Sequence, residues 1–233
     1  MYSKTMVNYI IGFLISILLF PILLVIGIQL VTFDQNFYAQ QYERLNTAER
    51  IGMSDEDLKR VTLQLTDYIR GRRDSLDRIT AEIDGVQRQV FNEREITHML
   101  DVKELFQFAV KVRNAAISSV VILLIFLYFL SSRRPLRYLA ASYLAAAGLL
   151  LFLLVIAVPI IQSNFTYYWD QFHYLFFDND LWILNPETDI MIQMVPEPFF
   201  NQAVLRVISY SGTGVVLLGL ASLWILRSLR KKY

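Results

Sequence analysis

The chain has 233 residues, of which 55% are apolar and 18% are charged, and its mean hydropathy is +0.40. Soluble domains carry about 25% charged residues, so this composition predicts a membrane protein with a sizeable part in water. The 22 basic and 21 acidic residues nearly cancel, which argues against a nucleic-acid partner. Cysteine is absent, which excludes disulfides, thiol catalysis and cysteine-ligated metals.

Four segments are apolar enough to cross a bilayer as helices, which takes about 20 residues each. They run from about 7 to 33, 114 to 130, 138 to 161 and 207 to 226. The first is too long for the apolar part of a secretory signal and lacks a clear cleavage site, so we expect a retained anchor. The fourth contains Ser211-Gly212-Thr213-Gly214, whose small side chains allow close helix packing.

These spans predict a mainly α membrane protein with four transmembrane helices and two folded extracytoplasmic loops. The expected regions are an N-terminus with the first transmembrane helix (1–33), a helical extracytoplasmic loop (34–113), two transmembrane helices joined by a short basic cytoplasmic linker (114–161), an aromatic extracytoplasmic loop with a small β-hairpin (162–206), and a fourth transmembrane helix with a basic cytoplasmic tail (207–233).

The charges predict which side of the membrane each loop faces. Short loops rich in Lys and Arg stay in the cytoplasm, and residues 162–204 contain neither. The first loop holds thirteen basic residues, but at 80 residues it is too long for the rule to apply strongly. Both termini are therefore expected inside, and all 21 acidic residues outside, fifteen in the first loop and six in the second. The basic residues that decide this are Lys4, Arg133, Arg134, Arg137, Arg227, Arg230, Lys231 and Lys232.

The first outer loop reads as helices. Apolar residues from Leu58 to Ile69 recur at spacings of three and four, with Ser54 as an N-cap and Gly71 as a stop. The same spacing recurs over 76–90 and predicts a second helix. We expect these helices to pack on each other and on the membrane surface.

A further helix is predicted where the first loop approaches the second span. Asn92 and Glu95 form a capping-box pattern. The helix that follows places His98 and Asp101 on one face, three residues apart.

The second outer loop has a different character. Two apolar runs, 182–184 and 190–194, flank Asn185-Pro186-Glu187-Thr188-Asp189, which predicts a small hairpin. Aromatic residues crowd this loop, and their rings suit the membrane–water interface and contact with lipid. The candidate lipid-binding residues are Tyr168, Trp169, Phe172, Phe176 and Trp182.

The two histidines of the chain, His98 and His173, are the candidate catalytic residues. One lies in each outer loop, and each has acidic residues nearby in sequence. With an ordinary pKa near 6.5, histidine carries protons near neutral pH. No G-x-S-x-G or H-E-x-x-H motif is present, which leaves acid–base chemistry at the outer leaflet. Two histidines and an aspartate also suit a metal ion, although their spacing is not a known ligand pattern.

Two stretches resemble a known family. FNEREITHMLDVK (91–103) and FHYLFFDNDLWILNPETDIMIQMVPEPFF (172–200) are similar to motifs of the lipoprotein intramolecular transacylase (Lit) family of bacterial integral membrane proteins. The resemblance implies a multi-pass protein of the bacterial cell membrane with an extracytoplasmic active site and no cofactor or metal. It implies that the sn-2 acyl chain of a diacylated lipoprotein moves onto the cysteine α-amine, giving the lyso form, with His98 and His173 as the functional histidines.

On this basis we hypothesise that His98 is the principal base, oriented by Asp101, and that His173 polarises the ester or protonates the leaving oxygen; the reverse assignment is open. Supporting roles are considered for Asp178, Asp180 and Asn185. The alternatives are a metal-dependent lipid hydrolase of the outer leaflet and a non-enzymatic membrane binding or assembly subunit.

Overall fold

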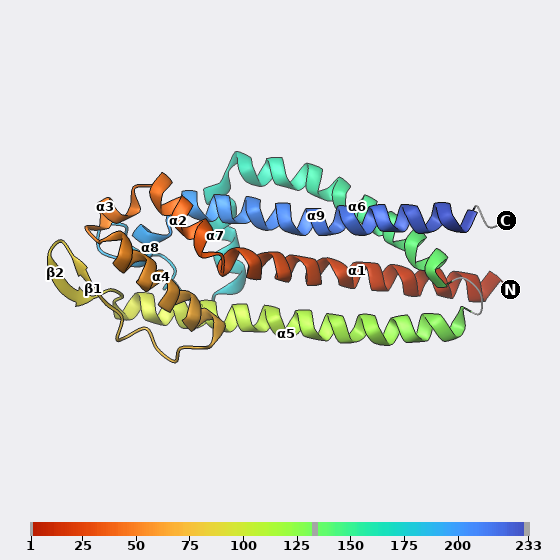
Figure 1. The fold of residues 1–233 in the computed structure, drawn as a ribbon, viewed down its shortest axis with the longest axis horizontal. Coiled ribbons are helices and arrows are strands. Elements are labelled where there is room, and N and C mark those ends of the chain that lie inside the picture. Colours follow the sequence, from red (N-terminus) through yellow and green to blue (C-terminus); the bar gives the residue numbers. More distant parts are fainter. Residues whose placement is uncertain (1, 132–134, 231–233) are drawn as a thin grey trace. The chain divides into compact units, whose positions relative to one another are not determined.

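The computed structural model describes residues 2–131 and 135–230, in two compact units. The first comprises Met1–Ile28, Val110–Asn164 and Val207–Tyr233, and the second comprises Gln29–Ala109 and Phe165–Arg206. The elements in chain order are α1 (Tyr2–Thr32), α2 (Gln35–Arg44), α3 (Thr47–Ile51), α4 (Asp55–Arg70), β1 (Thr80–Ile83), β2 (Val86–Gln89), α5 (Glu93–Leu130), α6 (Pro135–Ser163), α7 (Phe165–Phe176), α8 (Ile190–Met194) and α9 (Glu197–Arg230), as labelled in Figure 1.

The four predicted spans are confirmed as helices α1, α5, α6 and α9, each long and apolar enough to cross a membrane. Each helix extends beyond the apolar segment seen in the sequence. Helix α5 has 38 residues, which at 1.5 Å per residue is about 57 Å, far more than the roughly 30 Å of a hydrocarbon core. Its charged first part, 93–113, precedes the apolar stretch.

Small residues bring helices of the first unit into close contact, as the sequence predicted. Ser211 donates from its hydroxyl to the carbonyl of Leu23 (3.2 Å). A Cβ added at Gly214 would meet the end of the Leu23 side chain at 2.9 Å, so a larger residue there would have to displace that side chain. The Tyr143 hydroxyl of α6 also donates to the carbonyl of Val215 (2.9 Å).

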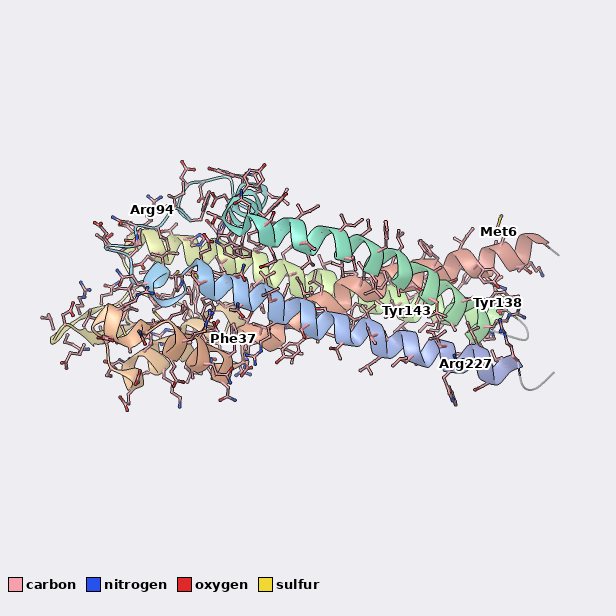
Figure 2. All side chains as sticks on the ribbon, turned by 90° about the horizontal axis from the view of Figure 1, so that it is seen from above. Met6, Phe37, Arg94, Tyr138, Tyr143 and Arg227 are labelled. Carbon is pink, nitrogen blue, oxygen red and sulfur yellow. The ribbon has the colours of Figure 1, made fainter. Side chains whose placement is uncertain are left out.

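Labelled residues mark one end of the first unit in Figure 2. Figure 2 shows Met6, Tyr138 and Arg227 together at one end of the first unit. The basic residues Lys4, Arg137 and Arg230 lie on the same helices close to these positions in sequence. The other basic residues of the orientation argument, Arg133, Arg134, Lys231 and Lys232, lie outside the described residues.

In the second unit, helix α4 begins and ends as predicted. The Ser54 hydroxyl accepts from the backbone N–H of Asp57 (3.1 Å). Gly71 closes the helix in the left-handed conformation, at φ 81°, which glycine adopts without steric cost. Leu58, Val61 and Leu65 point inward and are buried, so the spacing of apolar residues correctly gave the buried face.

The helix predicted over 76–90 is wrong, because this segment forms the antiparallel pair β1–β2 with Ile83 opposite Val86. Asp84 (φ 52°) and Gly85 (φ 77°) make a two-residue turn with both residues at positive φ, the geometry that favours Asp-Gly in hairpins. Ala81 and Ile83 are buried, and Asp57 of α4 accepts the N–H of Glu82 (3.0 Å). The step of four residues from Ile79 to Ile83 suits a helix, but it also suits a strand in which Ile79, Ala81 and Ile83 point to the same buried face.

The hairpin predicted for the second loop is also wrong. Residues 190–194 form the short helix α8 instead of a strand, and residues 182–184 belong to neither a helix nor a strand. The connecting segment closes on itself, because Asp189 accepts the N–H of Asn185 with Oδ2 (2.8 Å) and donates its own N–H to the Asn185 carbonyl (2.9 Å). Helix α8 contacts α3, and Arg50 of α3 donates to the Gln193 carbonyl of α8 (3.3 Å). Figure 1 shows α8 beside α3.

Candidate functional site

The two histidines converge within the second unit. His98 lies on the charged first part of α5 and His173 on α7, 75 residues further along the chain. Their ring centroids are 6.3 Å apart, and each residue is only 7% exposed. Two proton-transferring groups at this separation can act on one small reacting centre placed between them.

The start of α5 fixes the position of His98. The carboxylate of Glu95 accepts the N–H of Asn92 (2.7 Å), and the Asn92 side chain accepts the N–H of Glu95 (3.0 Å). This reciprocal pair confirms the predicted capping box. It defines where the helix begins, and so the direction in which His98 points one turn later.

Two buried acidic residues, Glu95 and Asp189, join α5 to the second loop, and the sequence reasoning did not identify either as part of the site. Glu95 is 1% exposed, and its second oxygen accepts the N–H of Met191 (2.6 Å). Asp189 is 5% exposed and accepts from the Asn92 side chain (2.9 Å). The capping box was the one signal for Glu95, and nothing in the sequence pattern indicated its contact with Met191.

A hydrogen bond sets the tautomer of His173. Its Nδ1 lies 2.7 Å from the carbonyl oxygen of Trp169, one turn earlier on α7. A carbonyl oxygen only accepts hydrogen bonds, so Nδ1 carries the proton. The other nitrogen, Nε2, then holds the free electron pair of the neutral ring and is available as a base.

Aromatic rings enclose His173. The Trp182 indole stacks on it at 4.6 Å between centroids and 21° between planes. Trp169 (4.8 Å) and Phe172 (5.5 Å) meet it edge-on. Phe177, which the sequence reasoning left out, contacts both His173 (5.7 Å) and His98 (5.4 Å).

Asp101 does not orient His98 by a hydrogen bond in the described part of the chain. Its Oδ2 accepts from the side chain of Asn179 (3.0 Å), while Nδ1 of His98 is buried and has no hydrogen-bond partner. Asp101 therefore links α5 to the segment after α7. The orienting bond expected at His98 is found at His173.

The contacts of the remaining predicted site residues are with residues other than the two histidines. Phe176 packs on Phe172 (4.9 Å), and Tyr168 packs on Tyr167 (5.2 Å). The Asp180 carbonyl accepts from Arg94, and Asp178 is exposed. Asn185 caps its own turn by accepting the N–H of Glu187 (3.0 Å).

Among residues 2–131 and 135–230, no three His, Cys, Asp or Glu side chains gather as a metal site needs. The two histidines therefore stand as a pair, without a third ligand of these types beside them. The site offers imidazole nitrogens of His98 and His173 and the indole N–H of Trp182 as polar groups.

The environment of His173 makes the stability of the protein depend on pH. Burial lowers the pKa of His173, and the hydrogen bond to Trp169 and the charge of Asp170 oppose this only in part. The unfolded chain, with a histidine pKa near 6.5, then binds more protons than the native state once the pH falls below about 6.5. Native stability is full above that pH and is lost as the pH decreases, by at most about 1.4 kcal/mol per pH unit for one group.

We therefore expect the melting temperature in detergent to fall more between pH 7.5 and pH 5.5 for the wild type than for His173→Asn. Asparagine retains an N–H for the Trp169 carbonyl but does not titrate. Both proteins keep His98, so the comparison isolates the titration of His173 together with its interaction with the neighbouring His98 ring. An equal fall in the two proteins would contradict this prediction.

Comparisons with known proteins agree with this architecture. A family model described as lipoprotein intramolecular transacylase Lit matches residues 13–200. The solved structure of the membrane integral lipoprotein intramolecular transacylase Lit from Bacillus cereus is 22% identical, with a TM-score of 0.76 over 97% of this chain and 98% of that chain. Structures of two variants of that protein, each with one histidine replaced, are 21% identical to this chain, and each has a TM-score of 0.76. The first match covers 100% of this chain and 97% of that chain, and the second covers 99% and 98%. These structures share the fold. No curated protein sequence matches the chain.

Proposed function

The chain belongs to the lipoprotein intramolecular transacylase (Lit) family and is a membrane transacylase, and from this premise we propose that it moves the sn-2 acyl chain of a diacylglyceryl-cysteine onto the cysteine α-amine of the same lipoprotein. The observation that supports this most directly is the pair of buried imidazoles 6.3 Å apart. The site offers proton transfer, and the substrate supplies both the nucleophile and the ester.

In the proposed reaction the neutral α-amine attacks the sn-2 carbonyl carbon. The new C–N bond forms as the carbonyl π bond opens, and the resulting tetrahedral intermediate collapses by breaking the bond to the glyceryl oxygen. The amine loses one proton and the glyceryl oxygen gains one. The products are an amide and a free hydroxyl, so atoms and protons balance without a further reactant.

We assign the base to His173 and the second role, toward the leaving oxygen, to His98. This reverses the assignment favoured from the sequence, because the orienting hydrogen bond is on His173 Nδ1. With its tautomer set, Nε2 accepts the amine proton without prior rearrangement. Acid–base assistance of this kind contributes about 10²–10⁴-fold to the rate.

Positioning of the substrate supplies the other large contribution. When amine and ester are held on one molecule in a reactive geometry, about 7–11 kcal/mol of the barrier is removed. Apolar residues of α7 that are exposed beside the site are suited to hold acyl chains. They are Phe172, Leu175 and Phe176.

We further propose that the second unit is extracytoplasmic and that both termini are cytoplasmic. All 21 acidic residues belong to the second unit. The described basic residues near the end formed by Met6, Tyr138 and Arg227 have no acidic neighbours in sequence. This is the distribution that places short basic segments inside.

A crossover experiment tests the proposal. Purified protein is given two synthetic diacylated lipopeptides at once, which differ in peptide mass and in the isotope label of the sn-2 chain. We expect each peptide to acquire only its own sn-2 label as an amide, read by tandem mass spectrometry. An amide that carries the sn-1 chain, or labels exchanged between peptides, would overturn the assigned chemistry.

A further inference from the structure

Trp182 carries a polar group that the mechanism above does not use. Its indole Nε1 is buried and has no hydrogen-bond partner in the structure. An indole N–H only donates, and tryptophan N–H groups usually find an acceptor when they are buried. Burying this donor without a partner is unfavourable, so its persistence beside His173 calls for an explanation.

This donor is in the immediate neighbourhood of the reacting groups. The Trp182 ring stacks on His173 at 4.6 Å between centroids. His98, the other ring at the site, also has a buried, unpartnered nitrogen. Of the described residues with such buried side-chain atoms, Trp182 is the one whose atom can only donate; the others are Asn8, Gln41, Thr47, Gln64, His98 and Ser131.

The segment that carries Trp182 is bonded to α5 at two positions, one before and one after His98 along the helix. Asn179 donates to Asp101 (3.0 Å) and accepts the N–H of Leu181 (3.0 Å). Arg94 donates to the carbonyl of Asp180. These contacts explain why Trp182 has a defined position relative to His98, and they give Asp101 a positioning role.

The proposed reaction has a matching need. As the amine attacks, the ester carbonyl oxygen becomes an oxyanion, and a preorganised donor stabilises that charge most in a site without water. Resting on the function proposed above, we propose that the Trp182 Nε1–H donates a hydrogen bond to the sn-2 carbonyl oxygen and to the oxyanion it becomes. The indole keeps its proton throughout, so no atom is transferred.

The test uses Trp182→Phe, which retains an aromatic ring over His173 and removes the donor. Loss of one oxyanion donor typically lowers kcat by about 10²–10³-fold, so we expect a kcat decrease of about 10²-fold with a small change in KM. Trp224→Phe is the matched control, because Trp224 is 70% exposed on the apolar part of α9 and its substitution is expected to leave kcat within about twofold.

A sulfur substitution in the substrate separates donation from a structural role. A thionoester at sn-2 presents C=S, a weaker hydrogen-bond acceptor than C=O. The wild type is expected to prefer oxygen over sulfur, and Trp182→Phe is expected to lose at least about tenfold of that preference. Incorporation of benzothienylalanine at position 182, which replaces N–H by sulfur at nearly the same ring shape, should reproduce the kcat decrease if phenylalanine disturbs folding.

Each outcome is decisive. A kcat within about twofold of the wild type for both variants overturns the proposal, and so does a kcat decrease with an unchanged oxygen-to-sulfur preference. If the wild type forms no sn-2 amide product at all, the proposed function fails first, which is a different result from any change at Trp182.

Discussion

His173→Asn is expected to lower the rate of lyso-lipopeptide formation by about 10²–10⁴-fold, the range that acid–base assistance supplies. The asparagine side chain can still donate to the Trp169 carbonyl that accepts from Nδ1, so α7 keeps its local structure. What is lost is Nε2, the atom proposed to accept the amine proton. The measurement is single-turnover mass spectrometry of a synthetic diacylated lipopeptide with equal amounts of folded protein.

His98→Gln is the companion variant, and the double variant tests whether the two rings act as a unit. If both histidines serve one proton-transfer cycle, the double variant should be little slower than the slower single variant. A rate for His173→Asn within tenfold of the wild type, with normal melting temperature, would remove His173 from the mechanism.

Glu95→Ala is expected to destabilise the second unit strongly. The buried carboxylate accepts the N–H groups of Asn92 and Met191, and an unsatisfied buried donor costs about 1–3 kcal/mol. Leaving the buried Met191 N–H unpaired costs about 1–3 kcal/mol, and losing the capping bond at the exposed Asn92 costs about 0.5–1.5 kcal/mol. The sum of about 1.5–4.5 kcal/mol corresponds to roughly 3–18 °C in melting temperature. Activity should fall as well, because the contact to Met191 fastens the second loop to the helix that carries His98.

Two further variants make this prediction specific. Glu95→Gln keeps one carbonyl oxygen and should cost less, about 1–3 kcal/mol. Glu93→Ala, an exposed acidic residue two positions earlier, is the control and should change the melting temperature little. Thermal unfolding in detergent, followed by tryptophan fluorescence, measures all three. Equal melting temperatures for Glu95→Ala and Glu93→Ala would show that the buried carboxylate contributes nothing.

Local signals predicted those elements whose ends are set by nearby residues. Helix α4 has its cap at Ser54 and its stop at Gly71, both within hydrogen-bonding reach of the helix they close. The start of α5 at Asn92 and Glu95 is of the same kind. The four apolar helices follow from length and composition, since a bilayer selects for both.

The errors arose where one pattern fits two structures. Over 76–90 the apolar spacing suits a helix. The Asp84-Gly85 pair instead forms a two-residue turn at positive φ, which is typical of a hairpin. In 182–194 the apolar runs are too short to distinguish strand from helix. There a long-range contact decides, because the N–H of Met191 is bound by Glu95, 96 residues earlier.

Sequence pattern alone could nominate His98 and His173, but it could not bring them together. Their approach depends on α5, α7 and the loop that Glu95 and Asp189 fasten to α5. The resemblance to the Lit family indicated that both histidines are functional, but not that their rings lie close together. The tautomer of His173 depends on a hydrogen bond within α7, and the unpaired N–H of Trp182 depends on tertiary packing; both were found only in the structure.

The aromatic enclosure of His173 bears on which acceptor receives the acyl group. Water is a competing nucleophile for any activated ester, and it far outnumbers the single amine of the substrate. Because His98 and His173 are each only 7% exposed, bulk water would have little access to an ester carbonyl held between them in the proposed reaction. If the proposed reaction is correct, the packing of Trp169, Phe172, Phe177 and Trp182 around His173 favours transfer of the fatty acid to the amine over its release by hydrolysis.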